Sequence, residues 1–261
     1  MIMNFICQQE ALNNIKILSE HRQHGVVITG DSGCGKTYIA RKYAKLLNIR
    51  DFYIINPVIS DLKTMIDTCV SATNPVVMCI ENLDDGVTQA SYPLLKLIED
   101  CPSHLYVVVT CCNMYGIPDT ILSRCAVVNI NPPTRSDIDQ YAESKDATTF
   151  TRLSKHKIWS CVKSMSDVDA VLKFAPEQLK YFDDLDKLNF AKDTVSNLSW
   201  KLQHYEDKSE TPVVLVVRYL MQLLEGHGRR ACLDCLNDLA DNRMSKNAII
   251  SKLVFENKYC R

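Results

Sequence analysis

A glycine-rich loop is the stretch of this chain whose residue types and spacing define a chemistry most clearly. It follows the apolar run of residues 26–29 and reads Gly30-Asp31-Ser32-Gly33-Cys34-Gly35-Lys36-Thr37. In the pattern G-x-x-x-x-G-K-[ST], backbone N–H groups surround phosphate oxygens, the lysine reaches the β and γ phosphates, and the hydroxyl binds Mg²⁺. The sequence therefore predicts a site for a nucleoside triphosphate and Mg²⁺, formed by Gly30, Asp31, Ser32, Gly33, Cys34, Gly35, Lys36, Thr37 and Tyr38.

A second candidate group lies where the apolar run of residues 76–80 ends in an acid. The next residues are Glu81-Asn82-Leu83-Asp84. In P-loop ATPases an acid at such a strand end orients Mg²⁺, and a neighbouring acid often activates the attacking water. Two registers are open: either Glu81 takes the metal position and Asn82 the catalytic one, or Ile80 takes the metal position and Glu81 the catalytic one.

The elements that must position these groups follow an alternating pattern. Short β-rich runs cover residues 26–29, 52–56, 76–80, 105–110 and 126–130, and helical patterns cover 8–21, 38–47, 62–70, 88–100 and 118–123. This alternation predicts an α/β fold in which helices flank a five-stranded parallel sheet. Pro93 falls inside the fourth of these helices and is expected to kink or shorten its first turns.

The pattern changes after Asn131-Pro132-Pro133, because prolines cannot continue a central strand. Helices are expected over residues 136–142, 155–165, 167–174, 188–205, 212–224, 229–239 and 246–255. Pro176 and the acidic residues 183–186 mark the best internal boundary. We therefore expect a nucleotide-binding domain over 1–133, a small helical lid over 134–180 and a C-terminal helical bundle over 181–261.

Composition limits the remaining classes. The chain has 261 residues and a formal net charge of −1, which argues against a protein that coats nucleic acid through its overall charge. We expect it to be cytoplasmic and without membrane contact, because it shows neither a signal peptide nor the ~20 apolar residues of a spanning helix. Twelve cysteines are then expected as reduced thiols. Cys232 and Cys235 have zinc-type spacing, but only Cys260 lies nearby, which favours two core-facing thiols.

Three motifs in the same order resemble those of the clamp-loader ATPases of the AAA+ group, especially their delta-prime-like members. They are the glycine-rich loop, residues 80–84 followed by Leu94-Leu95-Lys96-Leu97-Ile98-Glu99-Asp100-Cys101-Pro102, and Thr120-Ile121-Leu122-Ser123-Arg124-Cys125. The resemblance covers residues 8–133 and is weaker beyond them. It implies an AAA+ domain with a lid and a collar-like oligomerisation bundle, with ATP and Mg²⁺ as ligands. The implied partners are other clamp-loader subunits in a ring, a sliding clamp and primed DNA.

The resemblance also implies roles for single residues. It favours Glu81 with Thr37 at the metal and places Asn82 where the family has a catalytic glutamate. An amide positions water but does not accept its proton, so hydrolysis should be slow. Arg124 takes the place of an arginine that reaches the ATP of an adjacent subunit, a task suited to its fixed charge and bidentate geometry. The other interpretation of Arg124 is a surface salt bridge.

Two further positions depart from the family pattern. The residue that contacts the γ phosphate in the family corresponds to Cys112 by direct counting, and to Asn113 if the following loop slips by one residue. We predict Asn113, with a loop-capping role as the alternative. Ser166 stands where the family has a nucleotide-sensing arginine, and Lys163 or Lys173 could substitute for it.

Several functions remain open at this point. The leading interpretation is a subunit of a sliding-clamp loader in DNA replication, with weak hydrolysis of its own. The alternatives are another AAA+ replication or helicase-loading ATPase, a non-hydrolysing scaffold, and a stand-alone P-loop nucleotide kinase. Asn82 and Ser166 favour a scaffold over an efficient motor, whereas the helical C-terminal part and the Ser123-Arg124-Cys125 motif speak against a kinase.

Overall fold

The chain divides into two compact units. The computed structural model describes residues 8–55, 59–85, 87–174, 176–185, 213–224, 227–240, 248–249 and 251–253. The first unit comprises Met1–Asp137 with Ser164–Ser166, and the second comprises Ile138–Lys163 with Asp167–Arg261. The division at Asp137 lies four residues beyond the predicted end of the nucleotide-binding domain at 133.

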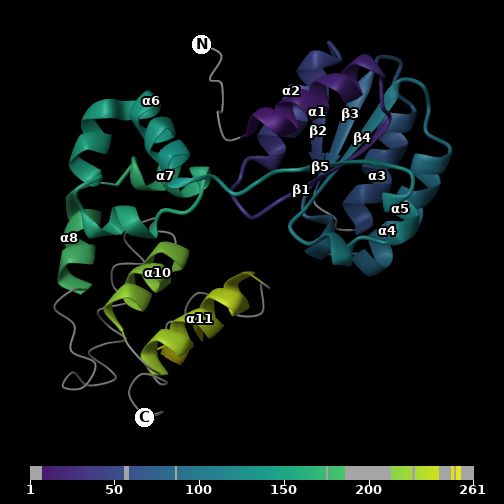
Figure 1. Cartoon of the computed structure of the whole chain (residues 1–261). Coiled ribbons are helices and arrows are strands. Elements are labelled where there is room, and N and C mark those ends of the chain that lie inside the picture. Colours follow the sequence, from purple (N-terminus) through teal and green to yellow (C-terminus); the bar gives the residue numbers. More distant parts are fainter. Residues whose placement is uncertain are drawn as a thin grey trace. The chain divides into compact units, whose positions relative to one another are not determined.

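A parallel sheet forms the centre of the first unit (Figure 1). Its strands are β1 (Gly25–Thr29), β2 (Asp51–Ile55), β3 (Val76–Ile80), β4 (Leu105–Cys111) and β5 (Ala126–Asn129). They are ordered β2-β3-β4-β1-β5, and every neighbouring pair is parallel. Parallel neighbours need crossover connections, usually helical. The predicted five-stranded α/β fold is confirmed.

Five helices flank the sheet on both faces, and all but the first connect successive strands. They are α1 (Gln9–Glu20), α2 (Lys36–Leu46), α3 (Ile59–Val70), α4 (Val87–Glu99) and α5 (Asp119–Leu122). Ile15 of α1 shares one hydrophobic core with Val26 of β1. Leu62 of α3 and Leu94 of α4 share the other core with Val27. Successive residues of β1 thus enter opposite cores, which is why the central strands read as continuous apolar runs.

Pro93 does not shorten α4, contrary to the sequence-based prediction. The helix begins at Val87 and continues through Pro93 to Glu99. A proline removes one backbone donor from a helix. Leu94 and Leu97 lie after it in the same helix and are buried in the core that contains Val27. Their burial holds this half of the helix in place despite the lost hydrogen bond.

Helices make up the rest of the described chain. They are α6 (Arg135–Leu153), the 3₁₀ helix η4 (Lys157–Cys161), α7 (Met165–Val171), α8 (Pro176–Leu185), α10 (Val213–Leu223) and α11 (His227–Ala240). In the second unit α10 packs against η4, α8 and α11. Residues 248–249 and 251–253 are also helical. The predicted helix over 188–205 lies outside the described residues, and the predicted helix over 155–165 is present only as η4.

Two of these helices differ from the prediction for identifiable reasons. α6 runs beyond residue 142, with a break at Asp146 (φ −155°, ψ 94°). The Asp146 carboxylate accepts hydrogen bonds from the Thr149 N–H and from the hydroxyls of Thr148 and Thr149, so it caps a second helical segment. Pro176 begins α8, because a proline at the first helical position loses no intrahelical bond. α8 therefore continues across the predicted boundary at 180.

The core of the second unit is partly aromatic. The Phe182 ring lies 5.9 Å from that of Phe174 and 5.1 Å from that of Tyr219. Cys232 and Cys235 are both buried on α11. Among the described helices of the chain, none combines the length and apolar character required to cross a membrane.

Candidate functional site

The glycine-rich loop connects the carboxyl end of β1 to the first turn of α2. Gly33 (φ 77°) and Gly35 (φ 97°) have left-handed backbone conformations that other residues rarely adopt. A Cβ atom on Gly35 would also lie 3.0 Å from Nε2 of Gln8. The loop therefore has the strand-to-helix context of a phosphate cradle at the amino end of a helix.

Lys36 extends from α2 back across this loop. Its side chain is mostly buried, at 7% exposure. Nζ donates hydrogen bonds to the carbonyl oxygen of Gly30 (2.7 Å), the carbonyl oxygen of Asp31 (3.1 Å) and Sγ of Cys112 (3.1 Å). The last contact brings the end of β4 to the loop, because β4 lies next to β1 in the sheet.

Thr37 and Glu81 form the second part of the site. The Thr37 hydroxyl donates a hydrogen bond to Oε1 of Glu81, so the residue after Lys36 meets the acid that follows β3. A hydroxyl beside a carboxylate is an oxygen donor set suited to Mg²⁺. Ile80 is fully buried in the core, which does not fit the register that gives it the metal position. The geometry fits Glu81 in that position.

Asn82 follows Glu81 with its side chain exposed. Its φ of 49° lies in the left-handed region, where asparagine is among the better tolerated residues. The Asn82 N–H donates to Oγ1 of Thr110 on β4 (3.1 Å). This bond ties the end of β3 to the neighbouring strand and holds the Asn82 backbone at the same edge of the sheet as the loop.

Asp84 organises the end of β4. Its Oδ2 accepts hydrogen bonds from the N–H groups of Cys112 (2.9 Å) and Asn113 (2.7 Å). Oδ1 of Asn113 accepts from the Tyr115 N–H and caps the 3₁₀ helix η3 (Met114–Gly116). Cys112, not Asn113, has its side chain against Lys36. A contact of Asn113 with phosphate stays a prediction, and the structure gives its side chain the capping contact that was the alternative.

Arg124 lies at the other edge of the sheet. It precedes β5, whereas the glycine-rich loop follows β1, and these neighbouring strands are parallel. A five-residue strand spans about 16 Å, so the two groups lie roughly that far apart along the strands. The Arg124 guanidinium pairs with Oε1 of Glu99 (2.8 Å) and donates to the carbonyl oxygen of Thr120 (2.9 Å). Arg124 is therefore separated from the loop of its own chain.

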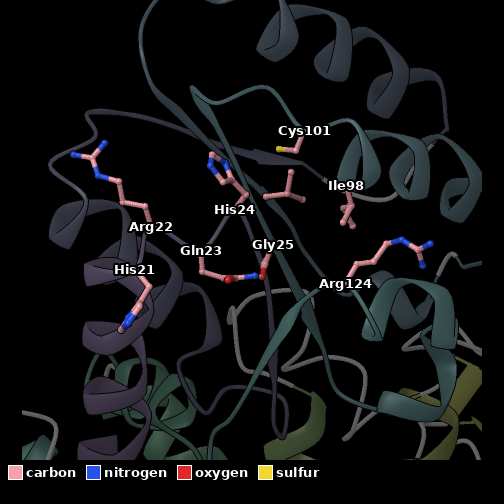
Figure 2. Close-up of a pocket in the computed structure, with 9 residues that line it drawn as sticks. His21, Arg22, Gln23, His24, Gly25, Ile98, Cys101 and Arg124 are labelled. Atoms are coloured by element: carbon pink, nitrogen blue, oxygen red, sulfur yellow. Dashed lines mark hydrogen bonds between the residues drawn. The ribbon is translucent and has the colours of Figure 1, made fainter.

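A pocket of about 320 Å³ lies beside Arg124 (Figure 2). His21, Arg22 and His24 line it from the segment that leads into β1, and Cys101 lines it from the segment after α4. Figure 2 shows Arg22 and Arg124 on opposite sides of this pocket. Basic and titratable side chains therefore gather at the amino ends of the strands.

Comparisons with known proteins agree with this arrangement. Residues 53–134 match the family model described as DNA polymerase III, delta subunit. The DNA polymerase III subunit gamma of Buchnera aphidicola subsp. Baizongia pistaciae is 28% identical over 44% of this chain and 39% of its own length. Part of the chain therefore resembles clamp-loader subunits in sequence. The match spans about two fifths of the length of that curated relative.

Solved structures show the same fold at low sequence identity. A DNA polymerase III gamma subunit-related protein from Thermotoga maritima superposes with a TM-score of 0.58 at 12% identity, covering 95% of this chain and 98% of that one. The RuvB Holliday junction branch migration motor of Thermotoga maritima superposes with a TM-score of 0.53 at 13% identity, covering 94% and 81%. The fold shared with these two proteins therefore extends over most of the chain.

Sequence reasoning missed Gln8 as part of this site. The residue is 3% exposed, and its Nε2 donates a hydrogen bond to the carbonyl oxygen of Cys34 in the loop. Its Oε1 is buried and has no hydrogen-bond partner among the residues that the structure describes. A single polar residue before a helix gives no signal of such a contact, because the contact depends on where α1 packs.

The predicted replacement of the nucleotide-sensing arginine falls on residues of both units. Ser166, which stands in the arginine position, belongs to the first unit and is exposed. Lys163 and Lys173 are exposed and belong to the second unit. A contact of either lysine with nucleotide stays a prediction.

Proposed function

We propose that this chain binds ATP with Mg²⁺ at its glycine-rich loop and supplies Arg124 to the ATP of a neighbouring subunit in a clamp loader for DNA replication. The observation that carries the proposal is the position of Arg124. It lies at the sheet edge opposite the loop, next to a basic pocket. We infer that a neighbouring chain packs against this edge, and that the assembly acts on a sliding clamp and primed DNA.

The residues of the loop suit the binding of a triphosphate. The backbone of the loop and the Lys36 ammonium offer donors to phosphate oxygens, and the amino end of α2 adds a favourable dipole. Thr37 and Glu81 would hold Mg²⁺, which neutralises charge on the phosphates when bound. The first step is therefore recognition of the phosphate chain by the protein's own cations and amides.

Asn82 limits hydrolysis at this site. Its amide can orient a water molecule but cannot take its proton at neutral pH. We therefore expect the isolated chain to bind ATP and to hydrolyse it only slowly. A non-hydrolysing scaffold, in which bound nucleotide only stabilises a subunit interface, is the second candidate, and the same residue favours it.

Arg124 suits a role in another chain's site because its charge is permanent and its guanidinium is half exposed. An arginine supplied to a transferring phosphoryl group can raise its rate by about 10³-fold or more. Releasing Arg124 requires that its exposed ion pair with Glu99 and its exposed hydrogen bond to the Thr120 carbonyl oxygen be broken, and such an ion pair contributes about 1 kcal/mol or less.

ATP turnover tests the proposal. It is measured for the chain alone and for a mixture with the other clamp-loader subunits encoded by the same genome, with primed DNA. We expect turnover only in the mixture, and a loss of about 10³-fold with Arg124→Ala. Arg50→Ala, which removes another exposed arginine of the first unit, is the matched control.

The outcomes separate the candidates. Rapid turnover by the chain alone would contradict the proposed dependence on a neighbour. Tight ATP binding with no change in the turnover of the mixture, and no effect of Arg124→Ala, would support the scaffold instead.

A further inference from the structure

Cys112 places a thiol beside the phosphate-binding lysine. Its N–H is fixed by the Asp84 carboxylate at the end of β4. Its side chain is exposed, and Sγ accepts a hydrogen bond from Nζ of Lys36 at 3.1 Å. The sulfur therefore contacts the cation that the proposed function assigns to the β and γ phosphates.

Phosphate and the Cys112 sulfur would compete for the same donor of Lys36. An ammonium has three N–H donors, and here they meet three acceptors: the carbonyl oxygens of Gly30 and Asp31 and the sulfur of Cys112. A phosphate oxygen must displace one of them to reach Nζ. Sulfur is the weakest hydrogen-bond acceptor of the three. Phosphate is therefore expected to replace Cys112, and a group attached to this sulfur would obstruct phosphate.

The surroundings of Cys112 also favour reaction at sulfur. The sulfur is exposed, so a reagent in solution can reach it. Cys34 lies in the same loop but is buried, at 1% exposure, and burial raises the pKa of its thiol although Lys36 opposes this effect. Exposure therefore distinguishes Cys112 from its neighbour.

A second feature indicates that this loop receives a polar ligand. Gln8 packs against the loop with its buried Oε1 lacking a hydrogen-bond partner among the described residues. Buried acceptors are normally satisfied by protein, water or ligand. Gln8 contacts Cys34 in the loop that Lys36 crosses, so Cys112 lies beside a loop that holds this unsatisfied buried acceptor.

We propose that Cys112 is a thiol-modification site whose reaction excludes nucleoside triphosphate from the loop, and that bound nucleotide protects it. The inference rests on the proposed binding of ATP at this loop. With a low-molecular-weight disulfide such as oxidised glutathione, the Cys112 thiolate attacks one sulfur and forms a new S–S bond. The original S–S bond breaks, the departing thiolate takes up a proton, and a free thiol reverses the reaction.

Modification rates test the chemistry. The full chain is treated with iodoacetamide, and each cysteine is followed by peptide mass spectrometry. We expect Mg²⁺–ATP to slow alkylation of Cys112 at least about tenfold, because it occupies the cation and covers the sulfur. This protection should be lost in Lys36→Gln, which lacks the phosphate-binding cation, and kept in Lys45→Gln, which changes an exposed lysine of the same helix.

Nucleotide affinity tests the consequence. Oxidised glutathione should weaken ATP binding by the wild-type chain about tenfold or more, and dithiothreitol should restore it. For Cys112→Ser the ratio of affinities before and after treatment should be about 1, whatever its starting affinity. ATP binding without protection of Cys112, or ATP binding that is unchanged after Cys112 has been modified, overturns this inference alone. A chain that binds no ATP overturns the proposed function as well.

Discussion

The two edges of the parallel sheet differ in how they hold their functional cations. At the carboxyl edge, Lys36 is 7% exposed and its donors meet three acceptors within the chain. At the amino edge, the ion pair between Arg124 and Glu99 leaves each side chain 42% exposed. One cation is fixed within a local site, and the other is held by a contact open to solvent.

This difference has an energetic meaning. An exposed ion pair contributes about 1 kcal/mol or less, because water screens it and two long side chains must be ordered. A buried ammonium that loses its acceptors suffers a penalty of several kcal/mol. Arg124 can therefore turn toward another molecule at little cost, whereas Lys36 can only exchange its acceptors in place. This contrast fits the proposal that the chain binds a ligand at the carboxyl edge and supplies Arg124 to a partner at the amino edge.

Lys36→Ala should abolish most nucleotide binding at the carboxyl edge without changing Arg124 at the amino edge. It removes two or more charge-assisted contacts to phosphate, so ATP affinity should fall on the order of 100-fold. Titration with a fluorescent ATP analogue measures this change. Lys45→Ala, which removes an exposed lysine from the last turn of the same helix, should leave the affinity unchanged.

The same variant probes the independence of the two edges. In a mixture with clamp-loader subunits, Lys36→Ala should still support the turnover that depends on Arg124 at a neighbour's site. Loss of that turnover together with ATP binding would show that the two edges are coupled.

Local sequence patterns predicted the sheet and the loop because each depends on neighbouring residues. The central strands are buried on both faces and therefore appear as apolar runs, and the loop motif encodes its own backbone conformation. Its fit to phosphate requires Gly33 and Gly35 at left-handed positions, which the motif supplies directly. Family resemblance added Arg124, a residue with no local pattern of its own.

The remaining features depend on contacts between distant segments. Direct counting gives Cys112 and a one-residue slip gives Asn113, which is the residue that we predict, but only the packing of β4 beside β1 shows that Cys112 contacts Lys36. Asn113 is instead fixed by the turn that follows it. Pro176 was predicted to mark a boundary, but a proline also fits the first position of a helix, and here it begins α8.

Asn82→Asp should increase hydrolysis at the carboxyl edge, because it introduces a carboxylate that can act as a base. A general base contributes roughly 10²- to 10⁴-fold to a rate, and the shorter aspartate should recover about tenfold in the turnover of the chain's own site. Aspartate is chosen over glutamate because it tolerates the φ of 49° better. Single-turnover hydrolysis of labelled ATP measures the effect.

The control for this variant is Asn113→Asp. It adds the same charge at the same edge of the sheet, but on a residue whose side chain caps η3. An equal increase for both variants would mean that added negative charge, and not a base beside Glu81, accelerates the reaction.

Glu99→Gln should have the smallest effect, because it changes only the exposed pair that holds Arg124. The free energy of unfolding should change by about 1 kcal/mol or less, and turnover in the clamp-loader mixture should rise by at most about fivefold. Chemical denaturation and ATPase assays measure the two quantities. Asp100→Asn neutralises the adjacent exposed carboxylate as a control. A destabilisation of several kcal/mol would show that Glu99 fixes Arg124 as part of the fold, and the amino edge would then resemble the carboxyl edge in rigidity.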